Sequence, residues 1–247
     1  MKSSNTVETR HVRQTALPEI GQSGQERLSK GSVLMVGVGG LGSVAGLYLA
    51  AAGVGRLGIV DDDQVELSNL QRQICHSTPD CGRLKTDSAK QRLLELNPDV
   101  VIEAFPVRFT QTNAESLLGE WDFVLDATDN FEAKFLIADA CHRLGKSYSH
   151  AGIAQFLGQT MTVVPGKTAC YRCLFDTQPD FAPDDPPKGP MGPVPGVIGS
   201  LQAMEAIKFL VGCGDLLTDR ILTYNALTAQ FREIRVKRNP ECRLCHS

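Results

Sequence analysis

The sequence lacks several features that would assign it to a class of protein at once. No apolar run reaches the roughly 18 residues that a membrane span needs, and the polar N-terminus has no signal-peptide core. Charge of one sign does not dominate either, because 25 Lys and Arg stand against 28 Asp and Glu, a formal net charge of −3. We therefore expect a cytoplasmic protein that binds neither membrane nor nucleic acid.

Metal-ligand patterns are also scarce. The histidines form no ligand spacing: His11, His76, His142, His150 and His246. Half of the eight cysteines are equally isolated, and we expect core or surface thiols at Cys75, Cys81, Cys141 and Cys213. The remaining four cysteines form the one cysteine pattern that indicates a metal.

What the sequence does contain is a strand–turn–helix pattern that is typical of α/β folds. Its 247 residues suit one large α/β domain, and 42% hydrophobic residues are ordinary for a sizeable core. Residues 33–36 predict an apolar strand and residues 41–52 a helix, with Gly53 at the expected C-terminal cap. Between them, Gly37-x-Gly39-x-x-Gly42 matches the dinucleotide-binding fingerprint, whose glycines allow a tight turn and a close approach of backbone to phosphate.

Polar residues after the next strand support a nucleotide site. The strand at 57–60 ends at Asp61, about 20 residues beyond the last glycine, where a ribose-binding acid is expected. The loop that follows carries Arg72, and a guanidinium suits phosphate because it donates two parallel hydrogen bonds. Lys85 opens a helix at 84–96 and is either a phosphate ligand or a surface lysine.

Strands are also expected at 100–105 and 121–125, with helices at 110–118 and 132–144. Strands this apolar are covered on both faces, as in a parallel sheet. Ligands of open α/β sheets bind beyond the carboxyl ends of the strands, so Asp61 and Asp129 should face one crevice. Asp129 is either a Mg²⁺ ligand beside a triphosphate or the N-cap of the following helix.

The second half has a different pattern, with strands expected at 147–151, 159–164, 221–225 and 231–236 and a helix at 200–211. We expect a Rossmann-like, mostly parallel sheet with helices on both faces, continued by a more antiparallel C-terminal half. The whole chain, 1–247, is expected to form one domain, with a nucleotide-binding half at 10–146 and a carrier-binding and zinc half at 147–247.

Three segments lie outside this regular pattern. Residues 1–9 are polar and expected to be disordered, and residues 10–30 are expected to be helical. Arg13 in that helix is interpreted, on pattern alone, as part of a solvated face. Residues 176–197 are rich in Pro, Gly and Asp without periodicity, and long loops of this kind are usually functional or disordered, which favours a flap over a partner.

The remaining cysteines form two C-x₂-C pairs, Cys170 with Cys173 and Cys242 with Cys245. Four thiolates in two such pairs are a tetrahedral ligand set for structural Zn²⁺. A redox C-x-x-C or a disulfide are the alternatives, but two matching pairs in a cytosolic chain favour zinc. The metal would tie the C-terminal end of the chain to its body.

Taken in order, these motifs resemble one family. The chain carries the glycine turn, the acidic run at 61–63, Ser68-Asn69-Leu70-Gln71-Arg72-Gln73, Lys85, Asp126-Ala127-Thr128-Asp129-Asn130, both cysteine pairs and the helical segment 199–208. This arrangement, over roughly residues 8–246, is similar to that of the ubiquitin-activating-enzyme (E1)-like adenylyltransferases of the ThiF/MoeB/HesA family. The stretch from Ser68 to Gln73 is far more specific than the glycines.

The resemblance implies ATP-dependent adenylation of the C-terminal glycine of a small ubiquitin-like sulfur-carrier protein that ends in Gly-Gly, with release of pyrophosphate. It implies catalytic roles for Arg13, Arg72, Lys85 and Asp129, with Asp129 holding Mg²⁺. Because Arg13 would reach into the neighbouring subunit's site, it also implies a homodimer with two carriers. The nucleotide-binding residues implied are Gly37, Gly39, Gly40, Gly42, Asp61, Asp63, Ser68, Asn69, Leu70, Gln71, Arg72, Lys85, Asp129 and Asn130.

One departure distinguishes types within the family. Several relatives have a cysteine before the Gly-Pro segment, and some of them use it for a covalent sulfur intermediate, whereas residues 184–190 here contain none. This favours the MoeB type, the molybdopterin-synthase adenylyltransferase that activates a MoaD-like carrier in molybdenum cofactor biosynthesis. A ThiF type, activating a ThiS-like carrier in thiamine or other sulfur-transfer pathways, is the alternative.

Two hypotheses of other classes use the same fingerprint. An NAD-dependent oxidoreductase would bind its dinucleotide at the glycine turn. However, the sequence has no recognisable set of residues for hydride transfer, and the presence of Asn69, Arg72 and Lys85 argues against this class. A nucleotide-gated scaffold without catalysis is the other.

Overall fold

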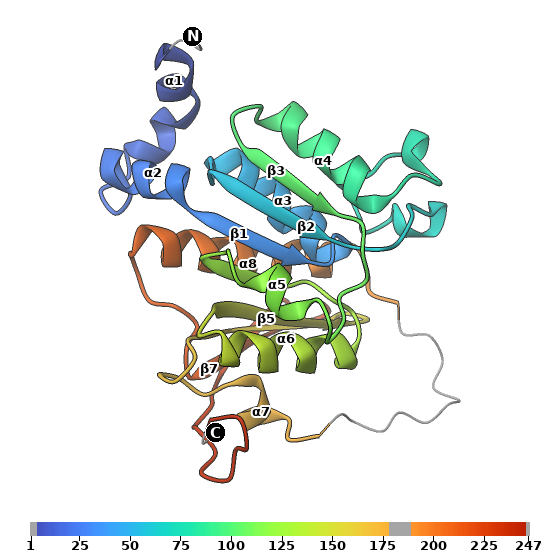
Figure 1. The fold of residues 1–247 in the computed structure, drawn as a ribbon, viewed down its shortest axis with the longest axis vertical. Coiled ribbons are helices and arrows are strands. Elements are labelled where there is room, and N and C mark those ends of the chain that lie inside the picture. The colour runs from blue at the N-terminus through green and yellow to red at the C-terminus, as the bar shows by residue number, and fades with distance from the viewer. Residues whose placement is uncertain (1–3, 178–188, 246–247) are drawn as a thin grey trace.

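The structure, a computed structural model that describes residues 4–177 and 189–245, is built on one eight-stranded sheet (Figure 1). The strand order is β3-β2-β1-β4-β5-β6-β7-β8. Neighbours from β3 to β5 pair in parallel and neighbours from β5 to β8 pair antiparallel, as the sequence predicted. The strands are β1 (Ser32–Val36), β2 (Arg56–Val60), β3 (Val101–Phe105), β4 (Phe123–Asp126), β5 (Ser147–Ala154), β6 (Leu157–Val163), β7 (Arg220–Asn225) and β8 (Gln230–Arg235).

Helices cover both faces of the sheet. The α-helices are α1 (Ser4–Thr15), α2 (Gly21–Lys30), α3 (Gly40–Ala52), α4 (Lys85–Leu96), α5 (Ala114–Leu118), α6 (Phe131–Arg143), α7 (Tyr171–Leu174) and α8 (Pro193–Val211), with 3₁₀ turns η1 (Leu67–Asn69) and η2 (Thr78–Asp80). Successive side chains of a strand point to opposite faces. Accordingly, Val33 and Met35 pack in the core beneath α3, α4 and α8, whereas Leu34 and Val36 pack beneath α5 and α6.

The long helix α8 is the element that the sequence predicted least well. It begins at Pro193 rather than at residue 200, because proline fits the first turn of a helix, where its missing N–H is not needed. Among the described helices it has the length and hydropathy of a membrane span, yet half of that stretch is buried in the protein. It packs against α3, β5 and β6 and is a core helix.

Other boundaries also differ from the predictions. The expected disorder of residues 1–9 is wrong from Ser4 onward, because α1 begins there, and residues 16–20, which include Pro18, separate α1 from α2. Helix α5 begins at Ala114, not at 110, because Asn113 accepts a hydrogen bond from the Thr110 amide in a turn. Residues 178–188 of the flap predicted at 176–197 lie outside the described residues, and the prediction of a loop is wrong at 193–197, which belong to α8.

We predict that Gly199→Ala destabilises the protein, because a Cβ there would lie 2.5 Å from the Leu41 carbonyl oxygen of α3. Overpacking of this kind costs about 1–3 kcal/mol. Gly196→Ala, on the same helix, is the matched control, since no atom lies within 4 Å of its added Cβ. Alanine at that position should stabilise the helix by up to about 1 kcal/mol. Urea unfolding measures both, and equal effects of the two substitutions would contradict the packing of α8 on α3.

Candidate active site

A cavity of about 1180 Å³ opens beyond the carboxyl ends of the parallel strands. Many residues expected at the nucleotide line it: Gly37, Gly39, Gly40, Asp61, Asp63, Arg72, Lys85, Asp129 and Asn130. The expected residues Gly42, Ser68, Asn69, Leu70 and Gln71 are not among its lining residues. Arg13 is exposed on α1 and also lies outside this cavity.

The glycine turn between β1 and α3 requires glycine for steric reasons. Gly37 has a φ of +94°, and a Cβ there would lie 2.7 Å from the Ala127 carbonyl oxygen. A Cβ on Gly42 would lie 2.2 Å from the Gly37 carbonyl oxygen, so Gly42 allows α3 to begin tightly against the turn. The first turn of α3 therefore presents its unpaired N–H groups and positive dipole end to the cavity, as an anion site requires.

Asp61 holds this turn in place. One carboxylate oxygen accepts a hydrogen bond from the Val38 amide at 2.8 Å, and the other accepts one from the Asp63 amide at 3.0 Å. Burial raises the pKa of Asp61 above its ordinary value, against the lowering effect of these amides and of Lys85. The sequence indicated a ligand-binding acid here but not this contact with the backbone of the turn.

Two cationic side chains lie on one side of the cavity. The Lys85 ammonium lies 2.7 Å from a carboxylate oxygen of Asp63, and Lys85 is buried, so the alternative of a surface lysine is wrong. Arg72 is half-buried and donates a hydrogen bond to the Ser68 carbonyl at 3.2 Å. Asp63 therefore positions the Lys85 ammonium, and the Ser68 carbonyl positions the Arg72 guanidinium. Both residues line the cavity.

The Ser68–Gln73 stretch shapes the wall more than it lines it. The buried Asn69 accepts a hydrogen bond from the Glu66 amide at 3.2 Å in a reciprocal cap of η1. Gln71 donates to the Pro190 carbonyl at 3.4 Å, which links this stretch to the segment before α8. Only Arg72 and Gln73 from this stretch line the cavity.

The loop after β4 brings Asp129 and Asn130 to the wall of the cavity. Asn130 is the N-cap of α6, because its side-chain oxygen accepts a hydrogen bond from the Ala133 amide at 2.9 Å. The alternative in which Asp129 is the N-cap is therefore wrong. The Asp129 carboxylate is left at the cavity wall, where carboxylate and phosphate oxygens together would suit Mg²⁺.

A buried charged cluster lies directly behind this loop. Asp126, 1% exposed, accepts hydrogen bonds from the Thr128 amide at 3.1 Å, from Lys134 at 3.1 Å and from His150 Nδ1 at 2.8 Å. Burial alone would raise the pKa of Asp126, but Lys134 and His150 together lower it to about 2. Neither Lys134 nor His150 was expected at the site from the sequence. The helical spacing of Lys134 from the apolar residues Ile137, Ala138 and Cys141 could have indicated that it lies on the inner face of α6.

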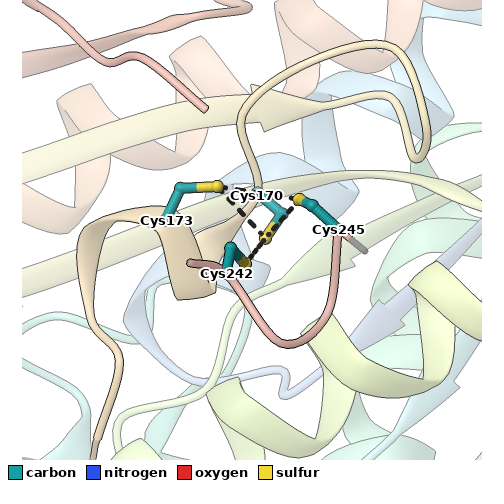
Figure 2. A group of neighbouring side chains, drawn as sticks. All are labelled: Cys170, Cys173, Cys242 and Cys245. Atoms are coloured by element: carbon teal, nitrogen blue, oxygen red, sulfur yellow. Dashed lines mark hydrogen bonds between the residues drawn. The ribbon is translucent and has the colours of Figure 1, made fainter. Parts of the chain in front are cut away.

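The four cysteines of the C-x₂-C pairs converge, as Figure 2 shows. The Sγ atom of Cys170 lies 3.7 Å from that of Cys173, 3.6 Å from that of Cys242 and 3.3 Å from that of Cys245, and the Cys173 and Cys245 sulfurs are 3.6 Å apart. A tetrahedral Zn²⁺ with bonds of about 2.3 Å would separate its sulfurs by about 3.8 Å. The cluster thus fits a four-coordinate metal, and these pairs are far longer than the roughly 2.0 Å of a disulfide.

Comparison with known proteins agrees with this architecture. Residues 11–244 match the ThiF family. The chain is 46% identical to the sulfur carrier protein adenylyltransferase of Thermus thermophilus, over 96% of this chain and 90% of that protein. It is 41% identical to a probable molybdopterin-synthase adenylyltransferase of Porphyra purpurea, over 92% of this chain and 60% of that protein. The structure of E. coli MccB with ATP matches with a TM-score of 0.80 and 26% identity, over 90% of this chain and 69% of that one.

We predict that Asp126→Asn lowers stability in a pH-dependent way. The folded-state pKa of Asp126 lies below its ordinary 3.8, so its contribution is present above about pH 4 and is lost as the pH falls toward 2. At neutral pH the variant should be less stable by about 3 kcal/mol, because Lys134 keeps a buried charge without its partner. Urea unfolding between pH 7 and 2.5 should show this difference narrowing below pH 4. A difference that does not change with pH would contradict the buried ion pair.

Proposed function

We propose the function from one premise: the chain belongs to the ThiF family. It is an adenylyltransferase, as its relatives are named. Its protein substrate is a small ubiquitin-like sulfur carrier, whose C-terminal glycine it activates with ATP. The observation that carries this proposal is one cavity in which the glycine turn, Arg72, Lys85 and Asp129 converge at the ends of the parallel strands.

The lining of the cavity suits ATP along its length. The glycine turn, the α3 N-terminus, Arg72 and Lys85 supply N–H donors and cations for a triphosphate. Val107, Phe109 and Leu136 give another part of the wall an apolar character that fits a base. MccB, with which the chain shares its fold, has been solved with ATP, which supports the same choice of nucleotide.

The carrier tail would enter the cavity along the part of its wall that β5 and the segment before α8 form. Ile153 of β5 and the segment Gly189–Pro190 also line the cavity. Met191 donates a hydrogen bond to the Gln155 carbonyl at 2.9 Å, which holds that segment beside the β5–β6 turn. A tail of two glycines has no side chains to clash with this wall, so its carboxylate can reach the nucleotide.

The reaction needs no nucleophile from the enzyme. A carboxylate oxygen of the carrier attacks the α-phosphorus, a new P–O bond forms, and the bond from that phosphorus to the oxygen bridging to the β-phosphate breaks. The products are the carrier acyl-adenylate and pyrophosphate. Arg72, Lys85 and the α3 N-terminus are placed to stabilise the charge that accumulates on the leaving group, and positioning supplies much of the rate. Asp129 would hold Mg²⁺, which supplies further charge neutralisation on the phosphates.

Three finer assignments complete the proposal. The carrier is MoaD-like and the pathway is molybdenum cofactor biosynthesis, which the molybdopterin-synthase adenylyltransferase among the relatives supports. The working unit is a homodimer with two carriers, in which Arg13 would reach the neighbouring subunit's site; its exposed position on α1, outside this chain's cavity, is compatible with that role. Zn²⁺ is structural, since four cysteines leave no coordination position for substrate.

We predict ATP–pyrophosphate exchange that depends on a carrier ending in Gly-Gly. Lys85→Met and Asp129→Ala should each lower the exchange rate by about 10²–10³-fold with the fold retained, because each removes a charge that acts on the phosphates or their metal. Lys90→Met, an exposed lysine on the same helix as Lys85, is the control and should exchange normally.

Three outcomes would contradict this function. Absence of exchange with every Gly-Gly carrier from the same genome would exclude adenylation. Tight NADH binding without ATP binding would instead support the oxidoreductase hypothesis. Undiminished activity of Asp129→Ala would favour a nucleotide-gated scaffold.

For the cysteine cluster we predict one zinc per chain by metal analysis. Cys173→Ser should lose the metal and lower the melting temperature, while the exchange rate per folded molecule stays close to that of the wild type, since the ion acts on folding. Cys213→Ser, outside the cluster, should keep both metal and stability. Wild-type protein that contains no zinc would remove this assignment.

A further inference from the structure

A buried lysine, Lys134, contacts the loop that carries Asp129 from the interior of the protein. Lys134 of α6 is only 6% exposed, although its ammonium is one of the most costly groups to bury. Its Nζ donates to the Thr128 carbonyl at 2.7 Å and to the Ala151 carbonyl of β5 at 2.6 Å. It also lies 3.1 Å and 3.2 Å from the two carboxylate oxygens of Asp126.

Asp126 contacts the same loop from its other side. One of its oxygens accepts hydrogen bonds from the Thr128 amide at 3.1 Å and from the Thr128 hydroxyl at 2.6 Å. The amide, the hydroxyl and the carbonyl of Thr128 are therefore all bonded to the Asp126–Lys134 pair. These hydrogen bonds restrict the rotation of the peptide that leads into Asp129.

Folding stability alone does not explain the buried Asp126–Lys134 ion pair. A buried ion pair is often replaceable by apolar residues of similar volume without loss of stability, so its presence alone is weak evidence for a structural role. Here the Asp126–Lys134 pair makes hydrogen bonds with the amide, the hydroxyl and the carbonyl of Thr128, the residue before the cavity-lining Asp129. On the far side of the loop, the Ala127 carbonyl lies against Gly37, which fixes the loop relative to the glycine turn.

We propose that Lys134 is a positioning residue: paired with Asp126, it fixes the Thr128 peptide and thereby aims the Asp129 carboxylate into the nucleotide cavity. The proposal deepens the proposed function and rests on it, because Asp129 is the residue expected to hold Mg²⁺ beside the triphosphate. Lys134 itself is not among the residues that line the cavity, so it would act through Asp129. Residues that orient a metal ligand typically change metal affinity by 10–100-fold when they are replaced.

The test uses a neutral pair in the full-length protein. Lys134→Met with Asp126→Asn removes both charges together, so no unpaired charge stays buried and the variant is expected to fold. Glu205→Gln is the matched control: Glu205 is a carboxylate of α8 that is 2% exposed and accepts from Thr162 at 2.6 Å and from the Leu217 amide at 2.7 Å, away from the Asp129 loop. Melting temperatures are recorded for each.

The first readout is the Mg²⁺ concentration that half-saturates ATP binding, measured by calorimetry without carrier. We expect it to rise about tenfold in the neutral pair and to stay within twofold of wild type in Glu205→Gln. In the Asp129→Ala background the two substitutions should add less than a further twofold, because their effect passes through Asp129. A purely structural role would not produce this dependence on Asp129.

The second readout is amide hydrogen exchange of residues 127–130 in the nucleotide-free protein, which we expect to be faster in the neutral pair than in Glu205→Gln. An unchanged Mg²⁺ requirement, or the same tenfold rise in the Asp129→Ala background, would overturn the proposal. If wild-type protein binds no MgATP, the proposed function fails. Hydrogen exchange then still decides on Lys134, since an unchanged exchange rate overturns its role in ordering the loop.

Discussion

The site depends on a steric constraint between two stretches of backbone. The turn after β1 and the loop after β4 lie so close that a Cβ on Gly37 would be 2.7 Å from the Ala127 carbonyl oxygen. These two strands are neighbours at the point where the sheet's connections diverge, β1 lying between β2 and β4. Ligands of doubly wound sheets bind at such a point. Close contact here brings the glycine turn and the Asp129 loop to one cavity.

Around this contact the acidic residues have different roles. Asp61 and Asp126 accept hydrogen bonds from backbone amides of the turn and of the loop, and Asp61 also lines the cavity. Asp63, which is paired with Lys85, and Asp129 line the cavity as well. The first pair fixes the geometry in which the second pair, with Lys85 and Arg72, can meet a ligand. Preorganised charge of this kind would stabilise the negative charge that develops on a departing pyrophosphate in the proposed reaction.

Much of this was predictable from sequence because its signals are local. The apolar runs predicted a mostly parallel sheet with a more antiparallel C-terminal half. The polar residues after the strands predicted that Asp61 and Asp129 share one crevice, and the paired cysteines predicted their own cluster. Two kinds of contact were not predictable. Pattern alone did not decide between neighbouring residues in local caps, where Asn69 faces its own turn and Asn130 instead of Asp129 caps α6. Pattern also did not show that Lys134 joins residues of β4 and β5, which depends on tertiary packing.

The central claim is that the cavity holds ATP for attack by the tail of another protein. Intact-mass spectrometry of a Gly-Gly carrier incubated with the enzyme and MgATP tests it most directly. The account predicts a carrier heavier by one adenylate, formed only with intact C-terminal glycine, together with released pyrophosphate. A carrier that stays unmodified while ATP is bound or consumed would contradict it.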